Sequence, residues 1–210
     1  MNNIDFIMNK NYPILCAIDI ETTGPNILKH EIISIGYCIG NIIGEIYLKK
    51  RINLKLDNNI IFDPETEKFW YKHISILELL KVNQIAPKEA IEQFIQDIDR
   101  FDSIGKLIII SDNITFDLGF LNYYLAKYLD RLPLTYRLGK EFRPVYDIDS
   151  YARGILQQDY KSIWTHDYEL ETRFKFKIKR NIDLIHTPDN DAEYIYNLHR
   201  MTLIRKNSRN

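Results

Sequence analysis

The sequence has only two cysteines in 210 residues, which is too few for a disulfide scaffold. Cys16 and Cys38 both lie in apolar runs that we interpret as strands, where an unmodified thiol behaves as a small hydrophobic side chain. No apolar run reaches the roughly 18 residues that a membrane-spanning helix needs. Residues 1–15 also lack the basic start and long apolar core of a secretory signal. We therefore expect a soluble, cytoplasmic protein that does not bind a membrane.

The chain also lacks an excess of charge of one sign. It has 28 Lys and Arg against 29 Asp and Glu, a net charge of −1. Overall charge therefore does not indicate a nucleic-acid partner, and such a partner needs a local basic patch. The hydrophobic share of 45% is enough for a core without structural metals, and the length is typical of one domain. We expect a single domain over residues 10–206 and a short N-terminal extension over residues 1–9.

The first half of the chain predicts an antiparallel group of strands. Residues 14–20 form an almost continuous apolar run, which is typical of a central strand covered on both faces. Residues 31–40 and 42–48 are also β-like, and Gly40 and Asn41 suit a tight hairpin turn between them. These three strands are expected to pair in sequence order.

The rest of the chain alternates between helical periodicity and short apolar runs. The predicted helices begin at Asp63 and Pro64, cover residues 90–101, begin near Asp117, and cover residues 189–205. The predicted strands cover residues 106–110 and end near Val145. The order of these elements indicates a mixed sheet with helices packed on its faces.

Two carboxylates lie close together at the end of the first predicted strand. Asp19 and Glu21 are two residues apart, so their side chains emerge from the same face of the sheet. Burying two like charges is unfavourable unless a cation neutralises them. Carboxylate oxygens at this spacing suit Mg²⁺ or Mn²⁺. The alternative is a solvated strand end, which is the more common explanation of an isolated pair of this kind.

Longer motifs surround this pair. Residues 19–24 read DIETTG, and this run resembles D-x-E-T-T-G, the first motif of the DEDD exonucleases, without a mismatch. The second motif of that superfamily has an Asn followed by Phe-Asp at the start of a helix. Asn113, Phe116 and Asp117 match it directly after the apolar run at residues 106–110. Motifs in the right order and in the right structural context are more specific than any one alone.

The third motif separates the branches of the superfamily. His186, Asp191 and Ala192 match H-x4-D-A, the form found in the His branch. Thr187 stands four residues before Asp191, where the Tyr branch has its tyrosine. The chain therefore resembles the DEDDh 3′→5′ exonuclease family over roughly residues 14–205.

The resemblance implies an RNase-H-like α/β fold: a mixed five-stranded sheet in the order 3-2-1-4-5 with helices on both faces. It implies that four carboxylates hold two divalent ions, Mg²⁺ or Mn²⁺, and that His186 is the general base. The four carboxylates are Asp19, Glu21, Asp117 and Asp191. It further implies that the residues closest to the substrate are Thr22, Thr23, Asn113 and Phe116.

The third motif contains an unexpected proline. Pro188 stands where the family more often has a small apolar residue, so the loop that carries His186 is expected to be stiffer or differently angled. Asp189 lies two residues before Asp191, and we interpret it as a helix N-cap rather than a metal ligand.

A second departure is the segment at residues 173–179, where cationic and apolar residues alternate as in a strand. It is either a solvated edge strand or a phosphate-binding strip. Phe69, Trp70 and Phe116 are aromatic candidates for stacking on terminal bases. The other histidines are interpreted as surface or core residues; they are His30, His73, His166 and His199.

The expected activity is hydrolysis of the terminal phosphodiester of DNA or RNA with release of nucleoside 5′-monophosphates. The expected partner is a nucleic acid with a free 3′ end, preferably single-stranded. One alternative is an oligoribonuclease or RNA-trimming enzyme, because discrimination depends on contacts with the 2′-hydroxyl rather than on the metal site. Another is a non-catalytic nucleic-acid-binding module of the same fold, although no ligand of the motif is missing. A third alternative is a structural role with a bound Ca²⁺ ion. Ca²⁺ takes oxygen ligands, so His186 would have no function in such a site.

Overall fold

The computed structural model describes residues 13–136, 142–155, 178 and 180–207. The predicted N-terminal extension lies outside the described residues, as does the basic segment at residues 173–179 apart from Ile178. Both remain predictions. Across the described ranges, every helix is too short or too polar to span a membrane.

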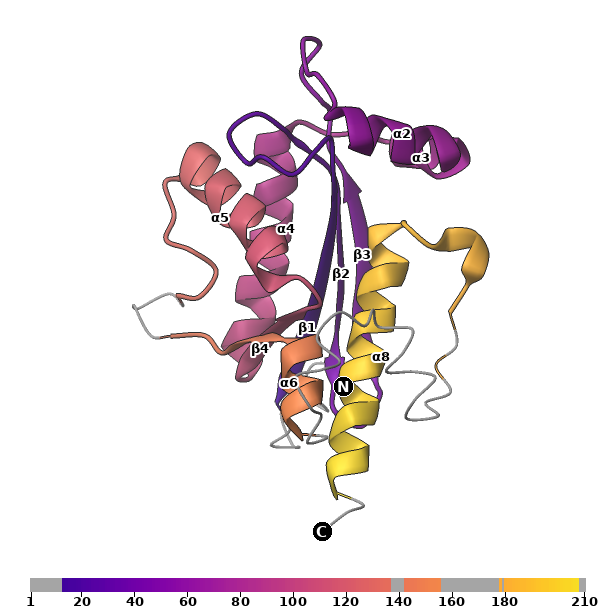
Figure 1. Cartoon of the computed structure of the whole chain (residues 1–210). Coiled ribbons are helices and arrows are strands. Elements are labelled where there is room, and N and C mark those ends of the chain that lie inside the picture. Colours follow the sequence, from indigo (N-terminus) through magenta and orange to yellow (C-terminus); the bar gives the residue numbers. More distant parts are fainter. Residues whose placement is uncertain (1–12, 137–141, 156–177, 179, 208–210) are drawn as a thin grey trace.

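The sheet has the predicted five strands in the predicted order, β3-β2-β1-β4-β5. The strands are β1 (Ile14–Thr22), β2 (Ile32–Asn41), β3 (Ile46–Asn53), β4 (Leu107–Ser111) and β5 (Val145–Asp147). The first three pair antiparallel, whereas β4 runs parallel to β1 and β5 runs parallel to β4. The RNase-H-like topology is therefore confirmed, with β1 at the centre of a mixed sheet (Figure 1).

Two strand positions differ from the prediction. β3 begins at Ile46 rather than at residue 42, because the hairpin loop starts after Asn41 and not at Gly40. The Asn41 Oδ1 atom accepts hydrogen bonds from the backbone N–H groups of the next loop residues, Ile43, Gly44 and Glu45, at 3.0–3.1 Å. These three hydrogen bonds close a loop that is longer than the expected two-residue turn. β5 starts at Val145 instead of ending there.

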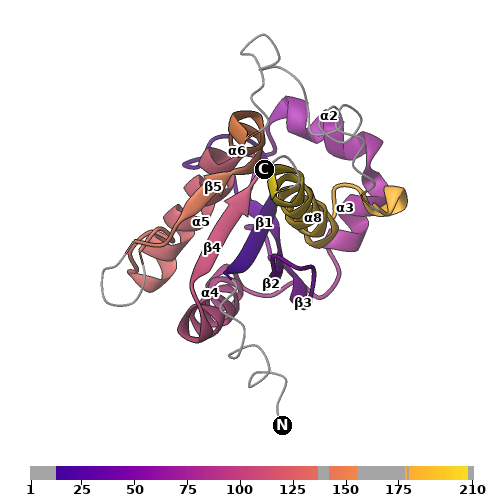
Figure 2. The ribbon, with the colours of Figure 1, turned by 90° about the horizontal axis from the view of Figure 1, so that it is seen from below.

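Helices cover both faces of the sheet. The described helices are α2 (Pro64–Lys72), α3 (Ile74–Leu80), α4 (Pro87–Ile104), α5 (Ile114–Leu129), α6 (Ile148–Ile155), the 3₁₀ turn η2 (Ile182–Leu184) and α8 (Pro188–Asn207). Figure 2 shows α4 and α5 on one side of the sheet and α8 on the other. Helix α5 begins three residues before the predicted start at Asp117.

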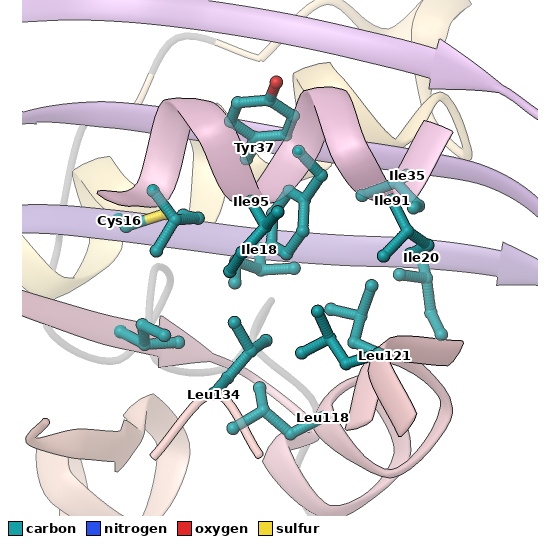
Figure 3. Packing of buried hydrophobic residues seen from close by; sticks show 14 of the residues in the cluster. Cys16, Ile18, Ile20, Ile35, Tyr37, Ile91, Ile95, Leu118, Leu121 and Leu134 are labelled. Carbon is teal, nitrogen blue, oxygen red and sulfur yellow. The ribbon is translucent and has the colours of Figure 1, made fainter. Parts of the chain in front are cut away.

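The side chains of β1 alternate between two hydrophobic clusters, as the position of a central strand requires. Cys16 and Ile18 face α4 and α5, where Leu121 packs against the same cluster (Figure 3). Leu15 and Ala17 face α6 and α8. Both cysteines are free and buried, in agreement with the expectation of unmodified core thiols.

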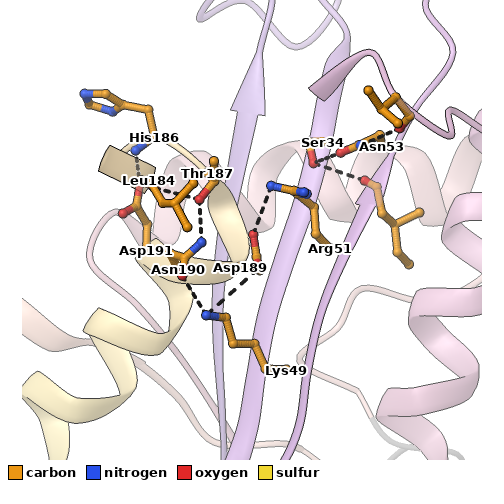
Figure 4. Close-up of polar contacts among 12 residues, drawn as sticks. Ser34, Lys49, Arg51, Asn53, Leu184, His186, Thr187, Asp189, Asn190 and Asp191 are labelled. Carbon is orange, nitrogen blue, oxygen red and sulfur yellow. Dashed lines mark hydrogen bonds and ion pairs between the residues drawn. The ribbon is translucent and has the colours of Figure 1, made fainter. Parts of the chain in front are cut away.

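The start of α8 explains the two unusual residues of the third motif. Pro188 occupies the first position of the helix, where its fixed φ angle and missing N–H are favourable. Asp189 therefore lies inside the first turn, and the N-cap interpretation is wrong. Its carboxylate forms ion pairs across to β3 instead, with Arg51 at 3.5 Å and Lys49 at 4.0 Å (Figure 4).

Candidate active site

The first two carboxylates project from the end of β1. Asp19 and Glu21 are partly exposed, and the buried Ile20 between them points to the opposite face. Asp19 is paired in register with Gly36 of the neighbouring strand β2. A Cβ atom at Gly36 would lie 1.9 Å from the carbonyl carbon of Pro188, so the glycine is what allows the start of α8 to approach these carboxylates.

Asp117 comes from the first turn of α5 and is 2% exposed. Its Oδ1 atom accepts a hydrogen bond from the backbone N–H of Ile20 at 3.2 Å. Its Oδ2 atom accepts a hydrogen bond from the hydroxyl of Ser111, the last residue of β4. The Ser111 hydroxyl oxygen also accepts the backbone N–H of Asn113 at 3.0 Å. These contacts fix Asp117 between the ends of β1 and β4, next to Asp19 and Glu21.

Asp191 and His186 come from the start of α8 and the loop before it. The backbone N–H of His186 donates to Asp191 Oδ2 at 2.8 Å (Figure 4). His186 has a φ angle of 69°, a left-handed conformation that is uncommon for residues other than glycine. One ligand atom each of Glu21, His186 and Asp191 lie within 4.8 Å of one another. The structure thus brings together the five residues that the motifs indicated.

Burial and like charges raise the pKa values of three carboxylates of this cluster. Burial is the largest cause for Asp19, Glu21 and Asp117, and repulsion from neighbouring carboxylates adds to it. Asp112, which the sequence did not single out, contributes to the raised pKa of all three. Such a cluster is stable at neutral pH only with a cation or with bound protons.

The residues present fit a hard divalent cation. Within the part of the chain that the structure describes, Asp19 Oδ2 is buried and accepts no hydrogen bond. A buried carboxylate oxygen without a partner is costly unless a ligand satisfies it. The surrounding carboxylate oxygens are hard donors, which suit Mg²⁺ or Mn²⁺. Asp19, Glu21, Asp117 and Asp191 are the side chains able to hold such ions.

The two threonines of the first motif shape the turn after β1. Thr22 is 6% exposed, and its hydroxyl donates to the carbonyl of Gly24 at 2.9 Å. Thr23 is fully buried, and its hydroxyl oxygen accepts the backbone N–H of Glu31 at 2.9 Å. Both side chains therefore hold the loop in place, and their contact with a nucleotide stays a prediction.

Asn113 and Phe116 lie at the start of α5. The Asn113 carbonyl accepts the backbone N–H groups of Phe116 and Asp117 at 2.9 and 3.0 Å, which orients the first turn of the helix. Asn113 is exposed and Phe116 is partly buried, and Phe116 directly precedes Asp117 in the sequence. The Phe116 ring packs against Phe120 with centroids 5.1 Å apart. Their contact with substrate also stays a prediction.

Helix α2 and its C-cap residue, His73, supply neighbours of His186. The rings of Phe69 and His73 lie 4.8 and 4.6 Å from the His186 ring, and 4.7 Å from each other. Trp70, in contrast, is 2% exposed and donates from Nε1 to the carbonyl of Thr22, so it is not available to stack on a base. His73 was interpreted from the sequence as an ordinary surface or core residue. His73 lies four residues after Phe69, so both side chains lie on one face of the helix. The sequence around them does not show what that face contacts.

His186 has the electrostatic environment of a base. Burial is the largest cause that lowers the pKa of its imidazole, while Asp191 opposes this shift. The imidazole is therefore neutral at physiological pH and able to accept a proton. Arg180 was also missed: its guanidinium Nη2 atom lies 2.7 Å from Asp191 Oδ1.

A mixed sheet in this order, with carboxylates from β1, α5 and α8 brought together at one edge, is the arrangement of an RNase-H-like nuclease fold. The family model described as exonuclease, RNase T, matches residues 16–199. The chain belongs to this exonuclease family, and the resemblance to DEDDh exonucleases is confirmed.

Individual proteins are similar to this chain in sequence or in fold. The 3′-5′ DNA exonuclease Cap18 of Escherichia coli is 28% identical over 131 residues, which span 60% of this chain and 64% of Cap18. The nuclease domain of 3′hExo, a DEDDh family member solved with rAMP, has a TM-score of 0.68 at 14% identity and covers 92% of this chain and 93% of that one. Pop2p of S. pombe, solved with Mg²⁺ and Mn²⁺, has a TM-score of 0.65 at 16% identity, with 96% and 87% covered.

Proposed function

We propose that this protein is a metal-dependent 3′→5′ exonuclease that removes nucleoside 5′-monophosphates from single-stranded DNA. The observation that carries the proposal is the convergence of Asp19, Glu21, Asp117, Asp191 and His186 at one edge of the sheet. Membership of the exonuclease family supports the reaction type. The relation to a DNA exonuclease favours DNA over RNA as the substrate.

Each residue has a definite task in this reaction. Asp19, Glu21, Asp117 and Asp191 would hold the metal ions beside the terminal phosphodiester. Two bound Mg²⁺ or Mn²⁺ ions would lower the pKa of water and stabilise negative charge on the leaving oxygen. His186 accepts the proton of the water molecule that attacks phosphorus. The bond between phosphorus and the 3′ oxygen breaks, and the shortened strand leaves with a new 3′-hydroxyl after this oxygen gains a proton.

Matched oligonucleotides test substrate and direction together. Single-stranded DNA and RNA of the same sequence, labelled at the 5′ end, are incubated with the protein and Mn²⁺ or Mg²⁺. We expect a ladder that shortens from the 3′ end of DNA, no reaction in EDTA, and protection of strands carrying a 3′ blocking group. Faster degradation of RNA would instead assign the RNA-trimming alternative, and cleavage of blocked strands would contradict exonuclease action.

A further inference from the structure

Arg180 lies outside the three motifs but contacts the site directly. Its Nη2 atom is 2.7 Å from Asp191 Oδ1, and its guanidinium carbon lies 4.4 Å from the ring centroid of Tyr194. Asp191 and Tyr194 are three residues apart on α8, so they are neighbours on the helix surface. The guanidinium is therefore held by a carboxylate on one side and by an aromatic ring on the other.

Both carboxylate oxygens of Asp191 already have donors. Oδ2 accepts the backbone N–H of His186 at 2.8 Å, and Oδ1 accepts Arg180. The first donor is a backbone N–H group, which carries no net charge. The second is a cation placed against the carboxylate that the proposed mechanism assigns to a divalent ion. A divalent ion at Asp191 and the Arg180 guanidinium repel each other, so the ion pair opposes metal binding.

We propose that Arg180 has two successive roles: it neutralises Asp191 before metal binding, and it binds the phosphate of the substrate strand afterwards. This inference rests on the proposed function, because it requires Asp191 to be a metal ligand. Four carboxylates balance the charge of two divalent ions, which leaves the positive charge of Arg180 for the phosphodiester. The planar guanidinium offers paired donors that match phosphate oxygens, and Tyr194 keeps it beside the site after it leaves Asp191.

Metal binding without nucleic acid tests the first role. Arg180→Gln removes the competing cation, and Arg131→Gln is the matched control. Arg131 forms a similar ion pair with Asp99 at 2.8 Å, and its side chain is 29% exposed against 30% for Arg180. We expect calorimetry to show Mn²⁺ binding at least about threefold tighter in Arg180→Gln than in the wild type, and unchanged in Arg131→Gln. Unchanged or weaker Mn²⁺ binding in Arg180→Gln would overturn the proposal.

Strand binding tests the second role. The probe is a single-stranded DNA whose terminal linkage is a phosphorothioate, which slows hydrolysis, with Mn²⁺ at saturation. We expect Arg180→Gln to bind it at least about fivefold more weakly than the wild type, with partial recovery in Arg180→Lys. The proposal requires both changes, so tighter metal binding with unaltered strand binding also contradicts it.

Asp191→Asn separates the inference from the function on which it rests. If Asp191→Asn abolishes Mn²⁺-dependent nuclease activity while Arg180→Gln behaves as the wild type, the function stands and the role of Arg180 is wrong. If Asp191→Asn changes neither Mn²⁺ binding nor activity, the proposed function itself fails. Circular dichroism spectra of all variants establish that they are folded.

Discussion

Asp19 lies among other carboxylates at the end of β1, and burial is the main reason that its pKa is raised in the folded protein. A raised pKa means that the folded state holds the proton more tightly than the unfolded state does. Without metal, the folded state is therefore favoured at low pH, and stability falls as the pH rises from about 4 towards the raised pKa. At neutral pH the raised pKa of Asp19 therefore lowers the stability of the metal-free protein.

We therefore predict that Asp19→Asn raises the melting temperature of the metal-free protein at pH 7.5. Removing one charge from the cluster is expected to stabilise the fold by about 1 kcal/mol or more, which corresponds to about 2–4 °C for a chain of this size. Differential scanning fluorimetry in EDTA measures it, with Asp57→Asn as the control, because Asp57 is exposed and its Oδ1 contact with the backbone N–H of Asn59 can be kept by Asn. Mn²⁺ should stabilise the wild type more than Asp19→Asn. A lower melting temperature of Asp19→Asn in EDTA would contradict the repulsion argument.

His186 makes a prediction about pH. A general base works only when neutral, so activity falls as the pH drops through the pKa of the imidazole. Because burial lowers this pKa below its usual value of about 6.5, we expect the midpoint of the acidic limb below pH 6.5. The measurement is kcat against pH at saturating Mn²⁺, so that carboxylate protonation does not empty the site. His186→Ala should lose about 10²–10⁴-fold in kcat. An acidic limb that His186→Ala leaves unchanged would exclude His186 as its origin.

At the scale of elements, the approach of α8 to β2 depends on Gly36. A methyl group there would collide with the backbone of Pro188, which has no flexible end that could move aside. We predict that Gly36→Ala lowers stability by about 1–3 kcal/mol and lowers activity more than tenfold, because Asp191 and His186 shift with α8. Gly105→Ala is the control, since its Cβ would meet side-chain atoms of Ile14, at 3.0 Å from Cδ1 and 3.4 Å from Cγ1, rather than backbone. Thermal melting and nuclease rates of both variants provide the test, and wild-type activity in Gly36→Ala would refute this dependence.

Helix α2 has its own effect on the active site through the ring contacts of Phe69 and His73 with His186. We predict that His73→Ala lowers kcat about tenfold with KM unchanged, because the base loses part of its support. His73→Phe should retain most of the activity, since an aromatic ring preserves the contact. In a His186→Ala background the His73→Ala change should have no further effect. Equal losses in His73→Phe and His73→Ala would show that packing is not the role of His73.

Local signals were sufficient for elements whose pattern is complete in one segment. The apolar run that carries Asp19, the Asp63-Pro64 helix start and the periodicity of α4 were all readable, and the structure has each of them. The start of β3 was not readable, because the Asn41 side chain extends the loop by accepting three backbone N–H groups. Asp189 was misassigned because its partners, Lys49 and Arg51, lie on a strand far away in the sequence.

At the scale of the whole molecule, the site is assembled from three distant parts of the chain. The motifs identified its carboxylates because each motif is short and local, and the fold then brings them to one edge of the sheet. The contacts of His73 and Arg180 with the site have no such signature. They exist only because His73, at the end of α2, meets the loop before α8, and because Arg180 meets α8 itself. The motifs thus predicted which carboxylates and which histidine lie together, but not the residues that surround them.

The most direct test of this account is the rate at which the whole protein releases mononucleotides from single-stranded DNA with Mn²⁺. The account predicts that the wild type releases 5′-monophosphates one at a time from the 3′ end. Asp19→Asn and Asp117→Asn, which remove charge without removing volume, should each be at least about 100-fold slower, in line with the large share of catalysis that metal sites provide. Internal cleavage by the wild type, or wild-type rates in both variants, would contradict the central claim.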